Sequence, residues 1–154
     1  MQEIFHSKYK GFRPGQEVSI RAILAGYDVL SIMPTGSGKT TVIAVPALTF
    51  KQLTGGVSIV LAPTKSVCQQ HEDKLNALWP HSTVYYKSAA ENERVVNEST
   101  CIVIVAPEGL RSLYNVLHGV NIRINIVAVD EVNTHNSLYR QTRGTKSVAY
   151  RCKR

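Results

Sequence analysis

The residues best suited to chemistry lie in one short segment, MPTGSGKT at residues 33–40. An apolar run precedes it and a helix-capable run follows it, which is the strand, glycine-rich turn and helix that a phosphate-binding loop needs. Gly36 and Gly38 allow the backbone to turn its N–H groups towards an anion, and the dipole of the following helix adds to the attraction. Lys39 can reach the β- and γ-phosphates of a nucleotide, and the Thr40 hydroxyl can ligate Mg²⁺.

A pair of acidic residues, Asp130 and Glu131, follows the last apolar run of the chain. Asp130 is placed to hold Mg²⁺ through water, and Glu131 to orient or deprotonate an attacking water. Acidic residues often cap strands, so the pair gains its weight from the loop about 90 residues upstream. The general loop pattern G-x-x-x-x-G-K-[ST] is missed at Met33. The alternative for the loop is therefore a Gly-Ser turn that happens to precede Lys-Thr.

Apolar segments that alternate with helix-capable segments must position these residues. Strands are expected at 28–33, 57–62, 83–86, 101–106 and 124–129, and helices at 16–25, 40–50, 64–79, 89–98 and 107–117. Pro46 is expected to kink its helix or end it early. Near-continuous apolar strands of this kind indicate an α/β fold in three layers, with a parallel sheet covered on both faces. Ligands bind at the carboxyl ends of the strands in such sheets, where the loop and Asp130 both fall.

Composition indicates one globular domain. Of the 154 residues 44% are apolar, no apolar run is long enough to cross a membrane, and the first residues lack the apolar core of a signal peptide. The three cysteines have neither zinc spacing nor an even number, which fits a reducing, intracellular setting, and the five dispersed histidines are expected to be surface or satisfied residues.

The net charge of +7 arises mostly after Glu131, where 23 residues carry six basic and no acidic side chains. This basic end can contact nucleic-acid phosphates or can be a solvated end without a partner.

Five motifs, in order along the chain, resemble those of RecQ-type helicases of superfamily 2. They are FRPGQE at 12–17 (the adenine-reading motif), MPTGSGKT at 33–40 (the phosphate loop, with Met in place of Gly), APT at 62–64 (motif Ia), VAPEGL at 105–110, and VAVDE at 127–131 (motif II). The resemblance covers about residues 4–133. It implies a parallel-sheet P-loop NTPase lobe of the RecA-like type, truncated after motif II. The domains expected are an N-terminal segment that starts the adenine-reading motif (1–15), a partial helicase ATP-binding lobe (16–133) and a basic divergent tail (134–154).

The resemblance also implies roles for individual residues. The nucleotide-binding set is Arg13, Gln16, Pro34, Thr35, Gly36, Ser37, Gly38, Lys39, Thr40 and Asp130. Within it Arg13 would lie against the base or its neighbour, and Gln16 would read the adenine edge with two hydrogen bonds. Lys39 and Glu131 would be catalytic, and Thr40 and Asp130 would hold Mg²⁺. Thr64 and Lys65 would contact a DNA phosphate, although Thr64 can equally be an ordinary helix N-cap and Lys65 merely solvated.

Several positions depart from the family. The usual Asp-Glu-Ala-His of motif II reads Asp-Glu-Val-Asn here, so Asn133 replaces a histidine that couples the nucleotide state to the rest of the motor. Ala106 replaces a threonine before Pro-Glu, and residues 134–139 lack the tryptophan and phenylalanine of the loop that senses DNA. The second lobe, which supplies an arginine finger, does not follow in this sequence.

The function expected from the resemblance is the ATP- and Mg²⁺-binding lobe of a DNA helicase that acts in DNA repair and recombination. The complete motor would move 3′-to-5′ on DNA and unwind it. Its expected partner is single-stranded or forked DNA, with no membrane partner, and its place is the nucleus if the organism is eukaryotic. The chain alone would hydrolyse ATP slowly and would not unwind DNA, because a second lobe or a partner must bring the arginine. One alternative is a non-catalytic ATP- or nucleic-acid-binding module or decoy. Another is a different P-loop ATPase, such as a chromatin remodeller or a restriction-enzyme motor.

Overall fold

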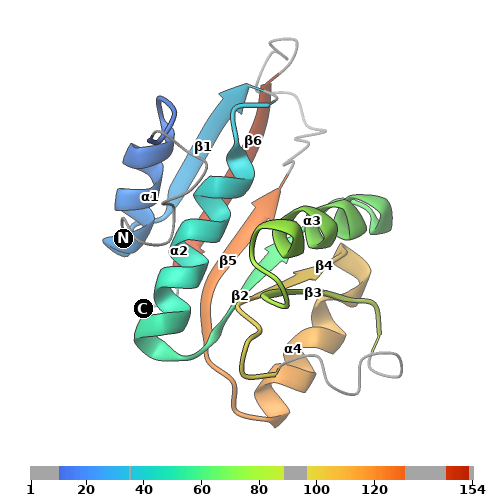
Figure 1. The fold of residues 1–154 in the computed structure, drawn as a ribbon. Helices are drawn as coiled ribbons and strands as arrows, with labels where there is room; N and C mark the ends of the chain where they lie inside the picture. The colour runs from blue at the N-terminus through green and yellow to red at the C-terminus, as the bar shows by residue number, and fades with distance from the viewer. Residues whose placement is uncertain (1–10, 35, 89–96, 131–144, 153–154) are drawn as a thin grey trace.

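The computed structural model describes residues 11–34, 36–88, 97–130 and 145–152, the last range as backbone (Figure 1). Its helices are α1 (Gln16–Leu24), α2 (Lys39–Thr54), α3 (Lys65–Leu78) and α4 (Leu110–Gly119), with a 3₁₀ turn η2 (Pro107–Gly109) before α4. Its strands are β1 (Val29–Pro34), β2 (Val57–Leu61), β3 (Thr83–Tyr86), β4 (Ile102–Val105), β5 (Ile124–Asp130) and β6 (Thr145–Cys152). The expected elements are confirmed along the described chain, except that most of the helix expected at 89–98 lies outside the described residues.

The described strands form one sheet in the order β1-β6-β5-β2-β4-β3. β3, β4, β2 and β5 pair in parallel, as the apolar runs predict. β6 is antiparallel to both of its neighbours, β1 and β5. β1 therefore runs in the same direction as β5, and only β6 joins it to the sheet. Val148, Tyr150 and Cys152 alternate with Ser147, Ala149 and Arg151, which is compatible with a strand, but no strand is expected above in this basic segment and nothing in it predicts the place between β1 and β5.

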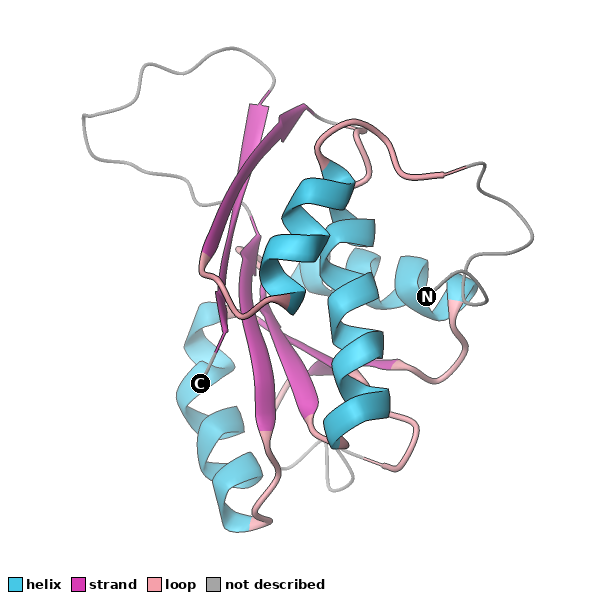
Figure 2. Ribbon diagram, turned by 90° about the vertical axis from the view of Figure 1, so that its left-hand side faces the viewer, coloured by secondary structure: helices cyan, strands magenta, loops and turns pink. Residues whose placement is uncertain are grey.

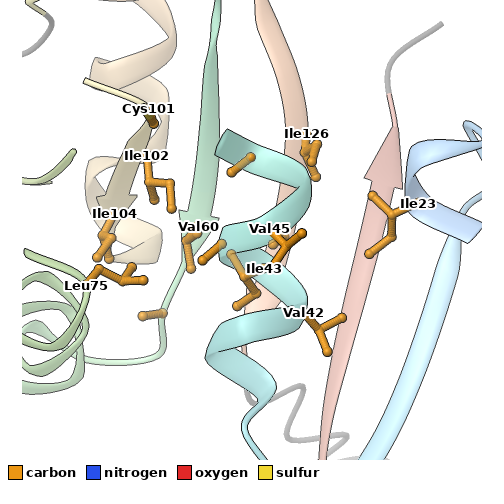
Figure 3. Close-up of a cluster of buried hydrophobic side chains, with 14 of the residues drawn as sticks. Ile23, Val42, Ile43, Val45, Val60, Leu75, Cys101, Ile102, Ile104 and Ile126 are labelled. Atoms are coloured by element: carbon orange, nitrogen blue, oxygen red, sulfur yellow. The ribbon is translucent and has the colours of Figure 1, made fainter. Parts of the chain in front are cut away.

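Two apolar clusters cover the two faces of the sheet, because successive side chains of a strand point to opposite sides. On β4, Ile102 and Ile104 belong to the cluster formed with α1, α2 and α3, whereas Val103 and Val105 belong to the cluster formed with α4. Figure 2 shows helices on both sides of the sheet, and Figure 3 shows the larger cluster under α2. The three-layer α/β fold is thereby confirmed.

Helix α2 differs from the expectation at Pro46. The helix continues through this residue and ends at Thr54, so the prediction that Pro46 ends it early is wrong. A proline inside a helix removes one hydrogen bond and crowds the preceding turn. Here residues 42–47 are all buried between the sheet and the neighbouring helices, and this packing outweighs the local cost. Within the described residues no helix is long and apolar enough to span a membrane.

Candidate nucleotide-binding site

The phosphate loop connects the end of β1 to the start of α2. β1 ends at Pro34, and α2 begins at Lys39 with Gly38 as its N-cap residue. Gly36 and Gly38 have φ angles of 79° and 85°, a left-handed conformation in which a residue with a Cβ atom is strained. The loop thus has the backbone that its glycines predict, and it precedes a helix N-terminus suited to an anion. Thr35 lies outside the described residues.

Lys39 folds back across the loop. Its Nζ donates to the main-chain oxygens of Met33 at 2.9 Å and of Pro34 at 3.0 Å. A charged amine forms stronger hydrogen bonds with a phosphate than with neutral carbonyls, because hydrogen bonds between two charged groups are the stronger ones. Replacing the carbonyls by a phosphate is therefore favourable. The lysine is therefore held beside the place where the sequence predicts the phosphates.

The two residues of the adenine-reading motif are both attached to the phosphate loop. Gln16 is buried at 4% exposure, and its Nε2 donates to the main-chain oxygens of Ser37 at 2.9 Å and Gly38 at 3.1 Å. Its Oε1 accepts the backbone N–H of Arg13 at 2.8 Å, and the Arg13 guanidinium donates to the main-chain oxygen of Gly36. Both ends of the Gln16 amide are thus engaged within the protein. The structure brings this motif and the loop together, and adenine reading stays a prediction.

The close approach of Gln16 gives Gly38 a second constraint. A Cβ atom at Gly38 would lie 2.4 Å from Gln16 Nε2. Glycine is therefore needed here for space as well as for its φ angle. The motif alone gives the reason for the φ angle, whereas the lack of space depends on a residue 22 positions earlier in the chain.

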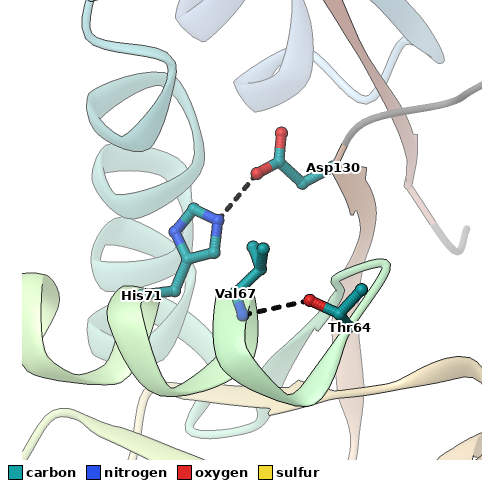
Figure 4. Close-up of polar contacts among 4 residues, drawn as sticks. All are labelled: Thr64, Val67, His71 and Asp130. Carbon is teal, nitrogen blue, oxygen red and sulfur yellow. Dashed lines mark hydrogen bonds and ion pairs between the residues drawn. The ribbon is translucent and has the colours of Figure 1, made fainter.

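Asp130 is the last residue of β5, and it contacts a histidine that sequence analysis did not assign to the site. His71 Nε2 lies 2.7 Å from Asp130 Oδ2, and the two side chains are only 12% and 9% exposed (Figure 4). The expectation of a satisfied histidine is met, but its partner is the carboxylate predicted to hold Mg²⁺. The sequence carries no local signal for this contact, since the two residues are 59 positions apart. Glu131 lies outside the described residues.

Thr64 and Lys65 lie at the start of α3, and both are exposed. Thr64 is the N-cap residue, and its hydroxyl accepts the backbone N–H of Val67 at 3.3 Å. This contact satisfies one of the N–H groups that a helix start leaves unpaired. The N-cap alternative is therefore confirmed for Thr64, and the DNA contact of both residues stays a prediction.

The donors present suit a magnesium nucleotide. Mg²⁺ prefers oxygen ligands, and in nucleotide sites it usually takes one or two protein carboxylates besides phosphate oxygens and water. Here the protein oxygens could come from the Asp130 carboxylate and the Thr40 hydroxyl. Among the described residues no group of three or more His, Cys, Asp or Glu side chains forms a metal site of its own. The Ser37 hydroxyl in the phosphate loop is buried and has no hydrogen-bond partner in the part of the chain that the structure describes. Such a group usually costs about 1–3 kcal/mol, so a ligand that bonds it is favoured.

A comparison with protein families identifies a family whose members carry a phosphate loop of this kind. The model of the DEAD/DEAH box helicases matches residues 13–152. The chain belongs to the DEAD/DEAH box helicase family. The match includes the phosphate loop, Asp130 and β6, and so extends beyond residue 133, where the motif resemblance ends.

The relatives of this helicase domain are RecQ-type enzymes. The ATP-dependent helicase SGS1 of Saccharomyces cerevisiae is 35% identical over 114 residues, which are 70% of this chain and 8% of the relative. The ATP-dependent DNA helicase RecQ of Pasteurella multocida is 30% identical over 133 residues, 81% of this chain and 20% of the relative. The RecQ-like resemblance is thereby confirmed, and the helicase domain described here spans a fifth or less of the length of these two relatives.

A solved structure shows the same fold. The DUF1998 helicase MrfA, crystallised with DNA and AMPPNP, superposes with a TM-score of 0.57 at 24% identity. The superposition covers 69% of this chain and 16% of that protein. It shows the same α/β fold, and the match to the DEAD/DEAH box helicases gives the lobe its RecA-like P-loop assignment.

Proposed function

We propose that this chain is the ATP-binding lobe of a RecQ-like DNA helicase, in which hydrolysis of ATP drives movement on DNA and its unwinding by the complete motor. The observation that supports this best is the placement of the phosphate loop and Asp130. The loop follows the carboxyl end of β1 and Asp130 is the last residue of β5, and these strands run in the same direction, so both lie at the edge of the sheet where ligands bind.

In this proposal the nucleotide replaces contacts that the loop now makes with itself. Lys39 exchanges the oxygens of Met33 and Pro34 for the β- and γ-phosphates, and the N-terminus of α2 supplies backbone N–H groups. Gln16 and Arg13 change partners from the loop backbone to the adenine edge and the base. Nucleotide binding and the conformation of the loop are therefore coupled through Gln16.

Thr40 and Asp130 are the residues we assign to Mg²⁺. The ion would bridge phosphate oxygens and neutralise the charge that develops on them. We assign the orientation of the attacking water to Glu131, which follows Asp130 directly. Ser37 is placed to give its buried hydroxyl to a phosphate oxygen.

We assign DNA binding to the exposed start of α3, where Thr64 and Lys65 can contact phosphates of single-stranded or forked DNA. Movement would be 3′-to-5′ in the complete motor, acting intracellularly in DNA repair and recombination, in the nucleus of a eukaryote. An arginine finger from a second lobe or a partner would complete the site. Since such an arginine is worth about 10³–10⁵ in rate, the chain alone should hydrolyse ATP slowly and should not unwind DNA.

The test is equilibrium binding of a fluorescent ATP analogue with Mg²⁺ to the purified chain and to Lys39→Ala. Removing a charged group that makes hydrogen bonds costs roughly 1.5–3 kcal/mol, so we expect affinity to fall about 10- to 100-fold. Lys51→Ala is the matched control, because Lys51 lies in the last turn of the same helix and its loss changes the net charge equally. We expect this control to bind like the wild-type chain.

Equal binding by the wild-type and Lys39→Ala chains, or no binding by either, would contradict the proposed function. Tight binding without any hydrolysis, even when a second lobe or arginine-bearing partner is added, would instead favour the non-catalytic module.

A further inference from the structure

The contact between His71 and Asp130 joins two elements that are separate in the chain. His71 lies on α3, and Asp130 ends β5. Both side chains are nearly buried, and the Nε2–Oδ2 distance of 2.7 Å is short for a nitrogen–oxygen hydrogen bond (Figure 4). A carboxylate can only accept, so the Nε2 atom carries the proton and donates it. The Asp130 carboxylate thus has a partner outside its own strand.

The helix that carries His71 is itself fixed to the sheet. Cys68 and Leu75, on the same side of α3, are buried in the larger apolar cluster. Glu72 Oε1 accepts the backbone N–H of Tyr85 at 2.9 Å, which ties α3 to β3. His71 therefore projects from a positioned helix and not from a loop, and a group on such an element holds its partner with the precision that a metal site needs.

We propose that His71 is a positioning residue that holds the Asp130 carboxylate in the orientation used for Mg²⁺ in the nucleotide complex. This inference rests on the proposed function and adds a residue outside the helicase motifs. Partners of this kind orient a metal-binding carboxylate, and their loss typically costs about 10- to 100-fold in metal affinity. The direct consequence is that His71 sets how strongly Mg²⁺ tightens nucleotide binding, while nucleotide binding without Mg²⁺ does not depend on it.

The experiment measures the affinity for a fluorescent ATP analogue twice, in excess Mg²⁺ and in a chelator, and takes the ratio of the two affinities. His71→Leu removes the donor and places an apolar side chain of similar size at the helix–sheet contact. His71→Gln keeps an N–H donor. His118→Gln is the control, because His118 is exposed on α4, which packs on the opposite face of the sheet.

We expect His71→Leu to lower the ratio of the affinity in Mg²⁺ to the affinity in chelator about tenfold. The affinity in chelator should stay within about twofold of the wild-type value. His71→Gln should recover most of the ratio, and His118→Gln should match the wild-type chain. A wild-type ratio in His71→Leu, an equal loss in both conditions, or no recovery in His71→Gln would overturn the positioning role. A wild-type chain that binds no nucleotide in either condition would overturn the proposed function itself, and the positioning role with it.

A second measurement reads the response of the wild-type chain itself, and a variant serves only to assign one signal. Long-range ¹H–¹⁵N spectra of the histidine rings are recorded with a non-hydrolysable ATP analogue before and after Mg²⁺ is added, and His71→Gln assigns the His71 signal. We expect a protonated Nε2 atom whose signal shifts on Mg²⁺ addition, while the His118 signal stays in place. An unprotonated Nε2, or a His71 signal that does not respond to Mg²⁺, would overturn the proposal.

Discussion

The two halves of the candidate site are held in different ways. Around the phosphate loop, Lys39, Gln16 and Arg13 all donate to main-chain oxygens of the loop itself. At the other half, the Asp130 carboxylate is held by His71, a side chain from a helix on the same sheet. A nucleotide can replace the first set, because phosphate and base edges offer stronger or equivalent acceptors. The second contact does not compete with the phosphates for donors, so it can persist when the ligand binds.

This difference indicates a division of labour. In the proposed nucleotide complex the loop half changes its hydrogen bonds, so Gln16 and α1 respond to occupancy of the site. In the same proposal α3 sets the orientation of the Asp130 carboxylate in advance, which reduces the reorganisation needed on binding. Three experiments probe the loop half, the packing of α3 behind Asp130, and the start of α3.

The largest effect is expected from Gly38→Ala in the loop half. A left-handed residue with a Cβ atom costs about 1–2 kcal/mol, and the new atom would also force the Gln16 amide away from its partners. We therefore expect the free energy of unfolding to fall by roughly 2–3 kcal/mol, and nucleotide binding to be lost. Urea unfolding and nucleotide titration measure the two effects.

Gly26→Ala is the control for Gly38→Ala. Gly26 has a φ angle of 86°, but nothing lies within 4 Å of a Cβ atom there. The Gly26→Ala chain should therefore lose only the free energy of a strained left-handed residue, about 1–2 kcal/mol of stability, and should keep nucleotide binding. Equal losses of stability in the two variants would show that Gln16 is not fixed against the loop as described.

The packing of α3, which supports the Asp130 half, is probed by alkaline pH. Burial, and then the negative charge of Glu108, raise the pKa of the Cys68 thiol from 9.0 to about 11. Between these values the unfolded chain loses a proton that the folded chain keeps, so stability falls as pH rises, by up to about 1.4 kcal/mol per pH unit. Cys68→Ala should reduce this slope in urea unfolding at pH 9–11. The pKa of Cys101 is also raised by burial, so part of the slope should remain. An unchanged slope in Cys68→Ala would mean that the thiol is not buried in the folded chain.

The smallest effect is expected from Thr64→Ala at the start of α3. Loss of the N-cap hydroxyl costs typically about 1 kcal/mol, and thermal unfolding would detect it. Lys65→Ala should leave stability nearly unchanged, since Lys65 is exposed. Both variants should weaken binding to a single-stranded oligonucleotide if the DNA contact exists. Loss of stability in Thr64→Ala without any loss of DNA affinity in either variant would leave Thr64 with the capping role alone.

The sequence by itself determined the features that depend on neighbouring residues. The glycine-rich turn between the first strand and its helix and the apolar strands follow from torsion angles and side-chain alternation over a few positions, and the structure confirms them. For Thr64 the sequence left an N-cap and a DNA contact open, and the structure confirms the N-cap. The motif order also determined the family, because each motif is a contiguous segment.

Tertiary structure alone decided three things. Pro46 remains inside α2 because buried packing outweighs a local rule. Residues 145–152 take the place between β1 and β5 because the backbones of both neighbouring strands pair with them, and no pattern within these eight residues specifies those two partners. His71 meets Asp130, and Gln16 meets Gly38, because the strand order and the helices packed on the sheet bring together residues 59 and 22 positions apart. Such contacts depend on the packing of whole elements, and no spacing within a single segment encodes them.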